Sequence, residues 1–231
     1  MDIIKAKIQQ AIGLLDEFHI DMWLVFVRET SMLADPVLSM LVAKDVTWQS
    51  FFLFTRSHGA MALIGNFDEE DFKKSGQFDR VIPYTEGVKQ DFLKILNEVE
   101  PRAIALNYSL DDPGADGLTH GMYLQLRAYL NGTPFDNRLT SAADLSSRLR
   151  ARKLPEEIAL LEHAAKVSDG IWKDVVSHLK PGLTEKQVAG MIDERIAKAG
   201  GVCAFDTIVN AGIEANFAGL NGFVNNLGGD V

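Results

Sequence analysis

The chain has 231 residues, of which 47% are hydrophobic and 24% are charged. This balance is typical of a globular protein with one large domain or two smaller ones, and it argues against wholesale disorder. The net charge of −9, from 23 basic and 32 acidic residues, argues against partners that need a basic surface, namely nucleic acid and anionic membranes.

Cys203 is the single cysteine, so neither an intrachain disulfide nor a cysteine-based zinc site is expected. Its apolar neighbours predict a buried, inert thiol. No signal peptide is expected, because no long apolar stretch follows the first residues. The longest apolar runs, of about six residues, are too short to span a membrane. These features predict a cytoplasmic protein.

The first half of the chain alternates between two periodicities. Apolar side chains recur every three or four residues over 4–15, which predicts an amphipathic helix. The continuous apolar run at 22–27 predicts a strand that is buried on both faces. Two further runs, at 50–55 and 60–64, flank a polar segment that ends in Gly59, which predicts a hairpin.

The same alternation continues to about residue 140. An amphipathic helix is predicted over 87–99 and a strand over 103–106. Asp116 is expected to cap a further helix, which Asn131 and Gly132 end. Helices that alternate with short buried strands indicate an α/β domain.

The pattern changes after residue 141, where no strand is predicted until Phe205. Pro155 begins a long helix that carries one apolar stripe as far as Leu179. Thr184 and Gln187 form a capping box for a second helix, which ends at a pair of glycines. A strand is predicted at 205–209, where Phe205 and three β-branched residues favour an extended backbone.

Several motifs, in this order and spacing, resemble the Xaa-Pro aminopeptidase, prolidase and creatinase family. In the second half they are Arg150–Ile158, Ala164–Ala165, Leu179–Glu185 and Phe205–Gly212. In the first half they are Arg28–Thr30, Asp35–Pro36, Thr47–Trp48, Asn107–Ser109 and Gly117–Tyr123, and these resemble one bacterial branch of the family.

The resemblance implies a fold and a division into domains. Residues 1–144 are expected to form a creatinase-like N-terminal α/β domain. Residues 145–231 are expected to form the truncated beginning of an α+β pita-bread catalytic domain. The fold class predicted for the whole chain is therefore mixed α/β.

The resemblance also implies hydrolysis of the peptide bond before proline, with two divalent metal ions (Mn, Co or Zn) in full-length relatives. No histidine follows His178 here, and Glu214 and Asp230 are the only acids after Asp206. Two scattered carboxylates cannot supply five ligands to two metals. No catalytic residue, metal ligand or cofactor is therefore assigned to this chain, which is expected to be inactive by itself.

Two residues are candidates for a substrate rim. In the family, loops of the N-terminal domain can border the active site of a neighbouring subunit, which suggests such a role for Trp48 and predicts a homo-oligomer. Packing of its indole within the loop is the alternative. His120 is the second candidate, with a local hydrogen bond at the start of a helix as the alternative.

Three functions stay open at this point. The first is a peptidase relative that acts on proline-containing peptides. The second is a non-catalytic module for dimerisation or partner binding. The third is a fragment of a creatinase-like amidinohydrolase. Neither a serine-hydrolase elbow nor a nucleotide-binding glycine motif occurs in the sequence, so it supports neither of those classes.

Overall fold

The computed structural model describes residues 2–42 and 44–210. The chain divides into two compact units, residues 1–156 (unit 1) and residues 157–231 (unit 2). Unit 1 is built around one six-stranded sheet with the strand order β4-β3-β2-β1-β5-β6. The strands are β1 (Met22–Val27), β2 (Ser50–Thr55), β3 (Gly59–Gly65), β4 (Arg80–Tyr84), β5 (Ile104–Leu106) and β6 (Leu139–Ser141).

The sheet is mixed. β2 pairs antiparallel with both β1 and β3, while β4, β5 and β6 join their neighbours in parallel. In consequence β1, β3, β4, β5 and β6 all end at the same edge, where β2 begins. The loops that follow these strands therefore converge there.

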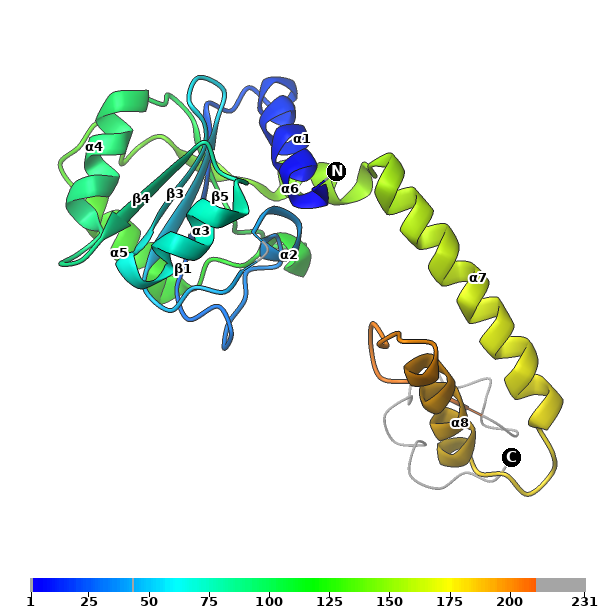
Figure 1. Cartoon of the computed structure of the whole chain (residues 1–231). Helices are drawn as coiled ribbons and strands as arrows, with labels where there is room; N and C mark the ends of the chain where they lie inside the picture. Colours follow the sequence, from blue (N-terminus) through cyan, green and yellow to red (C-terminus); the bar gives the residue numbers. More distant parts are fainter. Residues whose placement is uncertain (1, 43, 211–231) are drawn as a thin grey trace. The chain divides into compact units, whose positions relative to one another are not determined.

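Helices cover both faces of this sheet (Figure 1). The helices of unit 1 are α1 (Ile3–Glu17), α2 (Leu38–Leu41), α3 (Glu69–Ser75), α4 (Lys89–Val99), α5 (His120–Leu130) and α6 (Ala143–Ala151). Two short 3₁₀ turns, η1 (Asn66–Asp68) and η2 (Pro113–Ala115), complete the unit.

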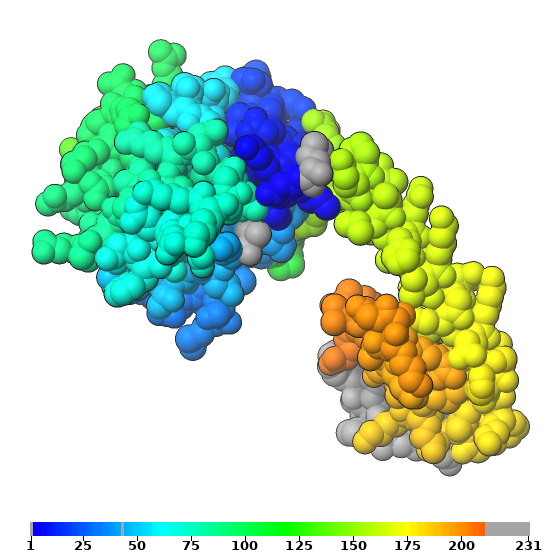
Figure 2. Space-filling model, viewed as in Figure 1, coloured from blue at the N-terminus to red at the C-terminus, as the bar shows by residue number. Residues whose placement is uncertain are grey.

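The strand alternation sorts apolar side chains into two clusters. Trp23 and Val25 of β1 face one cluster, which contains α1, α2, α3 and α6 side chains. Leu24 and Phe26 face the other cluster, which is closed by α4 and α5. A strand covered on both sides must be apolar at every position, which is why the run 22–27 is uninterrupted. The side chains of unit 1, blue to green in Figure 2, form a continuous surface in that view.

Lys7 joins α1 to the C-terminal end of α6, the last helix that lies wholly within unit 1. It lies buried on α1, and its Nζ donates to the carbonyl oxygens of Leu149 (2.9 Å) and Arg152 (2.8 Å), at the C-terminal end of α6. A cation there is favourable because the helix dipole is negative at its C-terminus. Since α6 packs on α1 in this way, unit 1 extends to residue 156, whereas the sequence-based boundary between residues 144 and 145 falls inside α6.

The described part of unit 2 consists mainly of α7 (Pro155–His178), which begins in unit 1, and α8 (Glu185–Lys198). The predicted capping box is present, since Thr184 Oγ1 accepts from Gln187 N and the Gln187 side chain accepts from Thr184 N. The residues between α8 and Asn210 are irregular.

The mixed α/β class predicted from the sequence is confirmed, and three local predictions are wrong. Thr119, not Asp116, caps α5, because its hydroxyl is the group that reaches Met122 N. Residues 205–209 form no strand, since their backbone has no partner strand among the described residues. Cys203 is exposed, because the segment around it lies outside any packed cluster of the described residues.

Candidate functional site

A cavity of about 740 Å³ lies in unit 1 at the edge where the strands converge. Its walls come from the end of β1, the segment before β2, the end of β4 and the start of α5. Loops gathered at the ends of parallel strands are the usual place for ligand sites in sheets of this kind. The topology therefore makes this cavity the first candidate for a functional site.

Aromatic rings form one wall of the cavity. The Trp48 ring lies 5.7 Å from the Tyr84 ring and stands edge-on to Phe67 at 5.3 Å, centroid to centroid. Gly65 leaves room for this indole, because a Cβ there would come within 2.9 Å of Trp48 Cε3. A larger residue at position 65 would displace the Trp48 ring.

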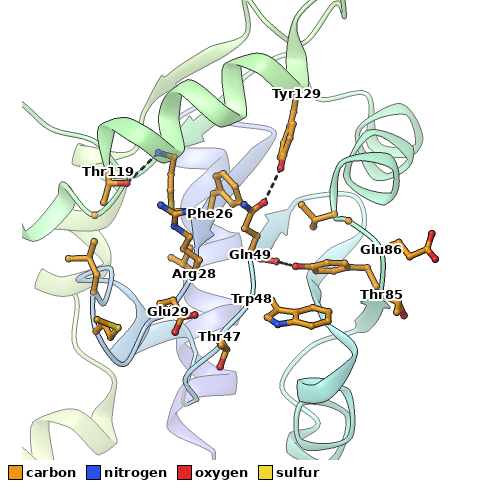
Figure 3. Close-up of a pocket in the computed structure, with 18 residues that line it drawn as sticks. Phe26, Arg28, Glu29, Thr47, Trp48, Gln49, Thr85, Glu86, Thr119 and Tyr129 are labelled. Atoms are coloured by element: carbon orange, nitrogen blue, oxygen red, sulfur yellow. Dashed lines mark hydrogen bonds between the residues drawn. The ribbon is translucent and has the colours of Figure 1, made fainter.

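Gln49 holds two of the ring-bearing side chains in place. Its backbone oxygen accepts from Tyr84 Oη at 2.8 Å, and its side-chain oxygen accepts from Tyr129 Oη at 2.9 Å (Figure 3). Its Nε2 donates to Gln125 Oε1, and Gln125 Nε2 donates to Tyr129 Oη. This closed set of hydrogen bonds fixes the wall before any ligand arrives.

Burial shifts the pKa of both tyrosine hydroxyls further above the physiological range. It raises the pKa of Tyr84 to about 12, and it also raises the pKa of Tyr129. Both hydroxyls therefore stay neutral donors to Gln49 at physiological pH.

Arg28 follows β1 directly and contributes a cation to the cavity. Its backbone is fixed because the next residues pair with the segment before β2: Glu29 N donates to Thr47 O and Thr30 N to Val46 O. Figure 3 shows the Arg28 side chain extending toward Thr119, at the start of α5. Among the described residues, no hydrogen bond or ion pair engages its guanidinium.

A buried polar chain anchors the loop that follows. Trp23 Nε1 donates to Asn107 Oδ1 at 2.6 Å, and Asn107 Nδ2 donates to both oxygens of Asp35 at 2.9 Å. Asp35 Oδ1 also accepts from Val37 N. The Asp35 carboxyl is almost fully buried, and burial raises its pKa. Gly117 lies against this carboxyl, which occupies the position that a Cβ would take.

The two predicted rim residues lie at different places. Trp48 lines the cavity described above. His120 is exposed and lines a separate cavity of about 450 Å³, together with Tyr108, Asp116 and Tyr123. The structure therefore does not bring Trp48 and His120 into one site.

Sequence reasoning missed most of the cavity. Gln49, Tyr84 and Tyr129 were not singled out, and Arg28 and Asp35 were noted only as parts of family-like motifs. A lone tyrosine at the end of a strand gives no signal in the sequence, because the cavity is made by segments that meet only in the folded sheet. The hint that the sequence offers is the long segment between the predicted strands 22–27 and 50–55, because loops carry function more often than cores do.

The described residues do not fit a metal centre. Within residues 2–42 and 44–210, no three His, Cys, Asp or Glu side chains come together in a way that could hold an ion. Asp206 lies in this range, whereas Glu214 and Asp230 lie outside the described residues. No helix in the described part of the chain is long and apolar enough to cross a membrane.

Sequence comparison finds relatives for part of the chain. Residues 159–222 match the profile of metallopeptidase family M24. The chain is 30% identical over 102 residues to the uncharacterized peptidase YqhT of Bacillus subtilis, covering 44% of this chain and 28% of the relative. It is 35% identical over 102 residues to the Xaa-Pro dipeptidase of Lactobacillus helveticus, covering 43% of this chain and 27% of that enzyme.

Structural comparison extends the likeness to most of the chain. The Xaa-Pro dipeptidase from Bacillus anthracis matches with a TM-score of 0.59 and 19% identity, over 85% of this chain and 49% of the other. This match concerns the fold, and the chain spans about half the length of that structure. Together the comparisons confirm the predicted resemblance to the Xaa-Pro peptidase and prolidase family.

Proposed function

Because the chain resembles metallopeptidase family M24, we propose that it is part of an Xaa-Pro dipeptidase-type enzyme, which hydrolyses the peptide bond before proline. The observation that carries this proposal is the 35% identity to an enzyme named Xaa-Pro dipeptidase. The likeness in fold to a solved Xaa-Pro dipeptidase supports it.

The two units have different proposed roles. We propose two roles for the creatinase-like N-terminal domain, expected over residues 1–144. Its loops would border the substrate-binding site, and the domain would assemble a homo-oligomer. Trp48 is its proposed rim residue, supported by its place in a preformed aromatic wall. His120 stays a second, separate rim candidate. Residues 145–231 would begin the catalytic domain of this enzyme, for which a cytoplasmic location is proposed.

The chain by itself is proposed to be inactive. In the family, two divalent ions such as Mn, Co or Zn would activate water, but the described residues do not form a site for them. The sequence has no histidine after His178 to serve as a late ligand. We therefore assign no metal ligand and no catalytic step to this chain.

A peptidase assay tests the proposed inactivity. The purified chain, supplied in turn with Mn²⁺, Co²⁺ and Zn²⁺, is expected to release no proline from a Xaa-Pro dipeptide. Turnover that requires a metal and is abolished by a chelator would contradict this expectation.

The DNA that follows the codon for Val231 tests the family function separately. Codons for the five separated Asp, Asp, His, Glu and Glu ligands would support an enzyme as the source of this chain. If no reading frame there encodes such a set, the dipeptidase proposal fails.

A non-catalytic partner-binding role is the second candidate, and one observation favours it. Large apolar side chains of α7 are exposed: Ile158 at 47%, Leu161 at 54% and Trp172 at 58%. Exposed apolar side chains that gather on one face normally mark an interface. If purified chain remained monomeric and bound no hydrophobic dye, this candidate would lose its support.

A further inference from the structure

The Arg28 guanidinium lines the cavity of unit 1 without a hydrogen bond or ion pair to any described residue. Among the described residues, no carboxylate pairs with Arg28, whose side chain extends toward Thr119 (Figure 3). Thr119 is the N-cap of α5, and the start of a helix carries partial positive charge. Both groups border one cavity, and each would attract an anion bound there.

We propose that this cavity binds a small molecule with one carboxylate and a planar apolar body, the carboxylate at Arg28 and the body against Trp48 and Tyr84. This inference does not rest on the dipeptidase proposal. Binding needs neither a metal nor hydrolysis.

The guanidinium accounts for the choice of a carboxylate. It can give two parallel N–H···O bonds to a carboxylate, a geometry that a single ammonium cannot match. Thr47 and Thr85 also line the cavity and offer hydroxyl donors.

The aromatic wall accounts for the planar body. The indole of Trp48 is wedged between Gly65, Tyr84 and Phe67, and Gln49 holds Tyr84 and Tyr129 by hydrogen bonds. Since these rings are already fixed, stacking a flat ligand against them costs little conformational entropy. The volume of about 740 Å³ is ample for one ring and its carboxylate.

Two acids of the lining limit the charge of the ligand. Glu29 and Glu86 both line the cavity, so with Arg28 the lining carries a formal charge of −1. A second negative charge on the ligand would meet repulsion from these carboxylates. A monocarboxylate is therefore favoured over a phosphate or a dicarboxylate.

Two sources share this chemistry, a free aromatic acid and the C-terminal end of a peptide. A titration followed by NMR separates them, with the full chain labelled with ¹⁵N and the indole N–H signal of Trp48 assigned through a Trp48→Phe variant. The probes are phenylacetate, N-acetyl-alanyl-phenylalanine and the amide of each. We expect at least one acid to bind saturably and its amide about tenfold more weakly or worse.

The acid that binds more tightly identifies the source. If neither acid shifts the Trp48 signal saturably up to about 10 mM, or if acids and amides bind alike, the proposal is overturned.

An Arg28→Gln variant, matched with Arg102→Gln, tests the assigned cation. Arg28 and Arg102 are both exposed, and Arg102 lines another cavity with Asp16 and Arg56. Arg28→Gln is expected to weaken binding of the acid about tenfold while leaving binding of the amide unchanged. Arg102→Gln should leave both unchanged. Equal affinity of the Arg28→Gln variant and the parent chain for the acid would overturn the proposal.

Discussion

Units 1 and 2 differ in how completely their described residues bury apolar surface. Unit 1 encloses its large apolar side chains in two clusters, one on each face of a sheet. In the described part of unit 2, Val175 and Val188 are the only apolar side chains that are fully buried. Both units contain amphipathic helices, so the difference lies in what the helices pack against. A sheet offers two broad faces, whereas α7 and α8 offer each other one narrow stripe.

The largest expected effect comes from moving the end of unit 1. A fragment of residues 1–140 lacks Leu145 and Leu149, whose burial contributes about 1.5–3 kcal/mol each. It also removes the carbonyl acceptors of the buried Lys7. The summed loss approaches the whole stability of a typical domain. Residues 1–156 should therefore unfold cooperatively in urea and residues 1–140 should not, as followed by circular dichroism.

Equal unfolding midpoints for the two fragments would show that α6 is dispensable for unit 1. The boundary would then lie nearer to the one expected from the sequence.

The second effect tests the polar chain within unit 1. Asn107→Ala removes both hydrogen bonds from Asn107 to the buried Asp35 carboxyl, which keeps only that from Val37 N, and it removes the acceptor of the Trp23 indole. The free energy of unfolding should fall by about 3–5 kcal/mol. Asn97→Ala is the matched control, because Asn97 makes one exposed bond to Leu93 O within α4. For this control, urea unfolding should show that the free energy of unfolding falls by less than about 0.5 kcal/mol. Similar losses of unfolding free energy for the two variants would contradict the stabilising role assigned to these buried hydrogen bonds.

A smaller effect is expected in how the free energy of unfolding depends on pH. Because burial raises the pKa of Asp35, the folded state holds this proton more tightly than the unfolded state. The carboxyl thus adds stability below its unfolded pKa of about 3.9, and that stability is lost as the pH rises through the folded pKa. Asp35→Asn lacks this dependence. The free energy of unfolding of the variant minus that of the parent should therefore increase as the pH rises from about 4.

A difference between variant and parent that stays flat, or that falls with pH, would contradict a raised pKa for Asp35. Urea unfolding at a series of pH values measures it. Asp35→Asn changes the hydrogen bonds equally at every pH, so only the slope is diagnostic.

The packing explains which elements could be predicted from the sequence. β1 is covered on both faces, so its continuous apolar run was sufficient to predict it as a buried strand. β4 has a single neighbour, β3, and most of its side chains are not buried, so no such run marks it. The run at 205–209 has strand-like residues, but a strand also needs a partner, and the described residues supply none.

The candidate site could be predicted only in part, for a related reason. The family resemblance, through loops that border a neighbouring active site, suggests Trp48 as a rim residue, and Trp48 lines the cavity. Tyr84 and Tyr129, which also line the cavity, come from distant segments that the fold brings together. The approach of the Arg28 side chain to the start of α5 (Figure 3) depends on the same convergence, which no local pattern encodes.

Sedimentation of the full chain beside residues 1–156, with a hydrophobic dye as second readout, tests most directly whether only unit 1 completes its own core. Along α7, Ile158, Leu161 and Trp172 are about half exposed, so each would gain about half of the roughly 1.5–3 kcal/mol that full burial of an exposed side chain contributes. The full chain should therefore self-associate with rising concentration and bind the dye, while residues 1–156 do neither. A full chain that stays monomeric at high micromolar concentration without binding the dye would contradict this account.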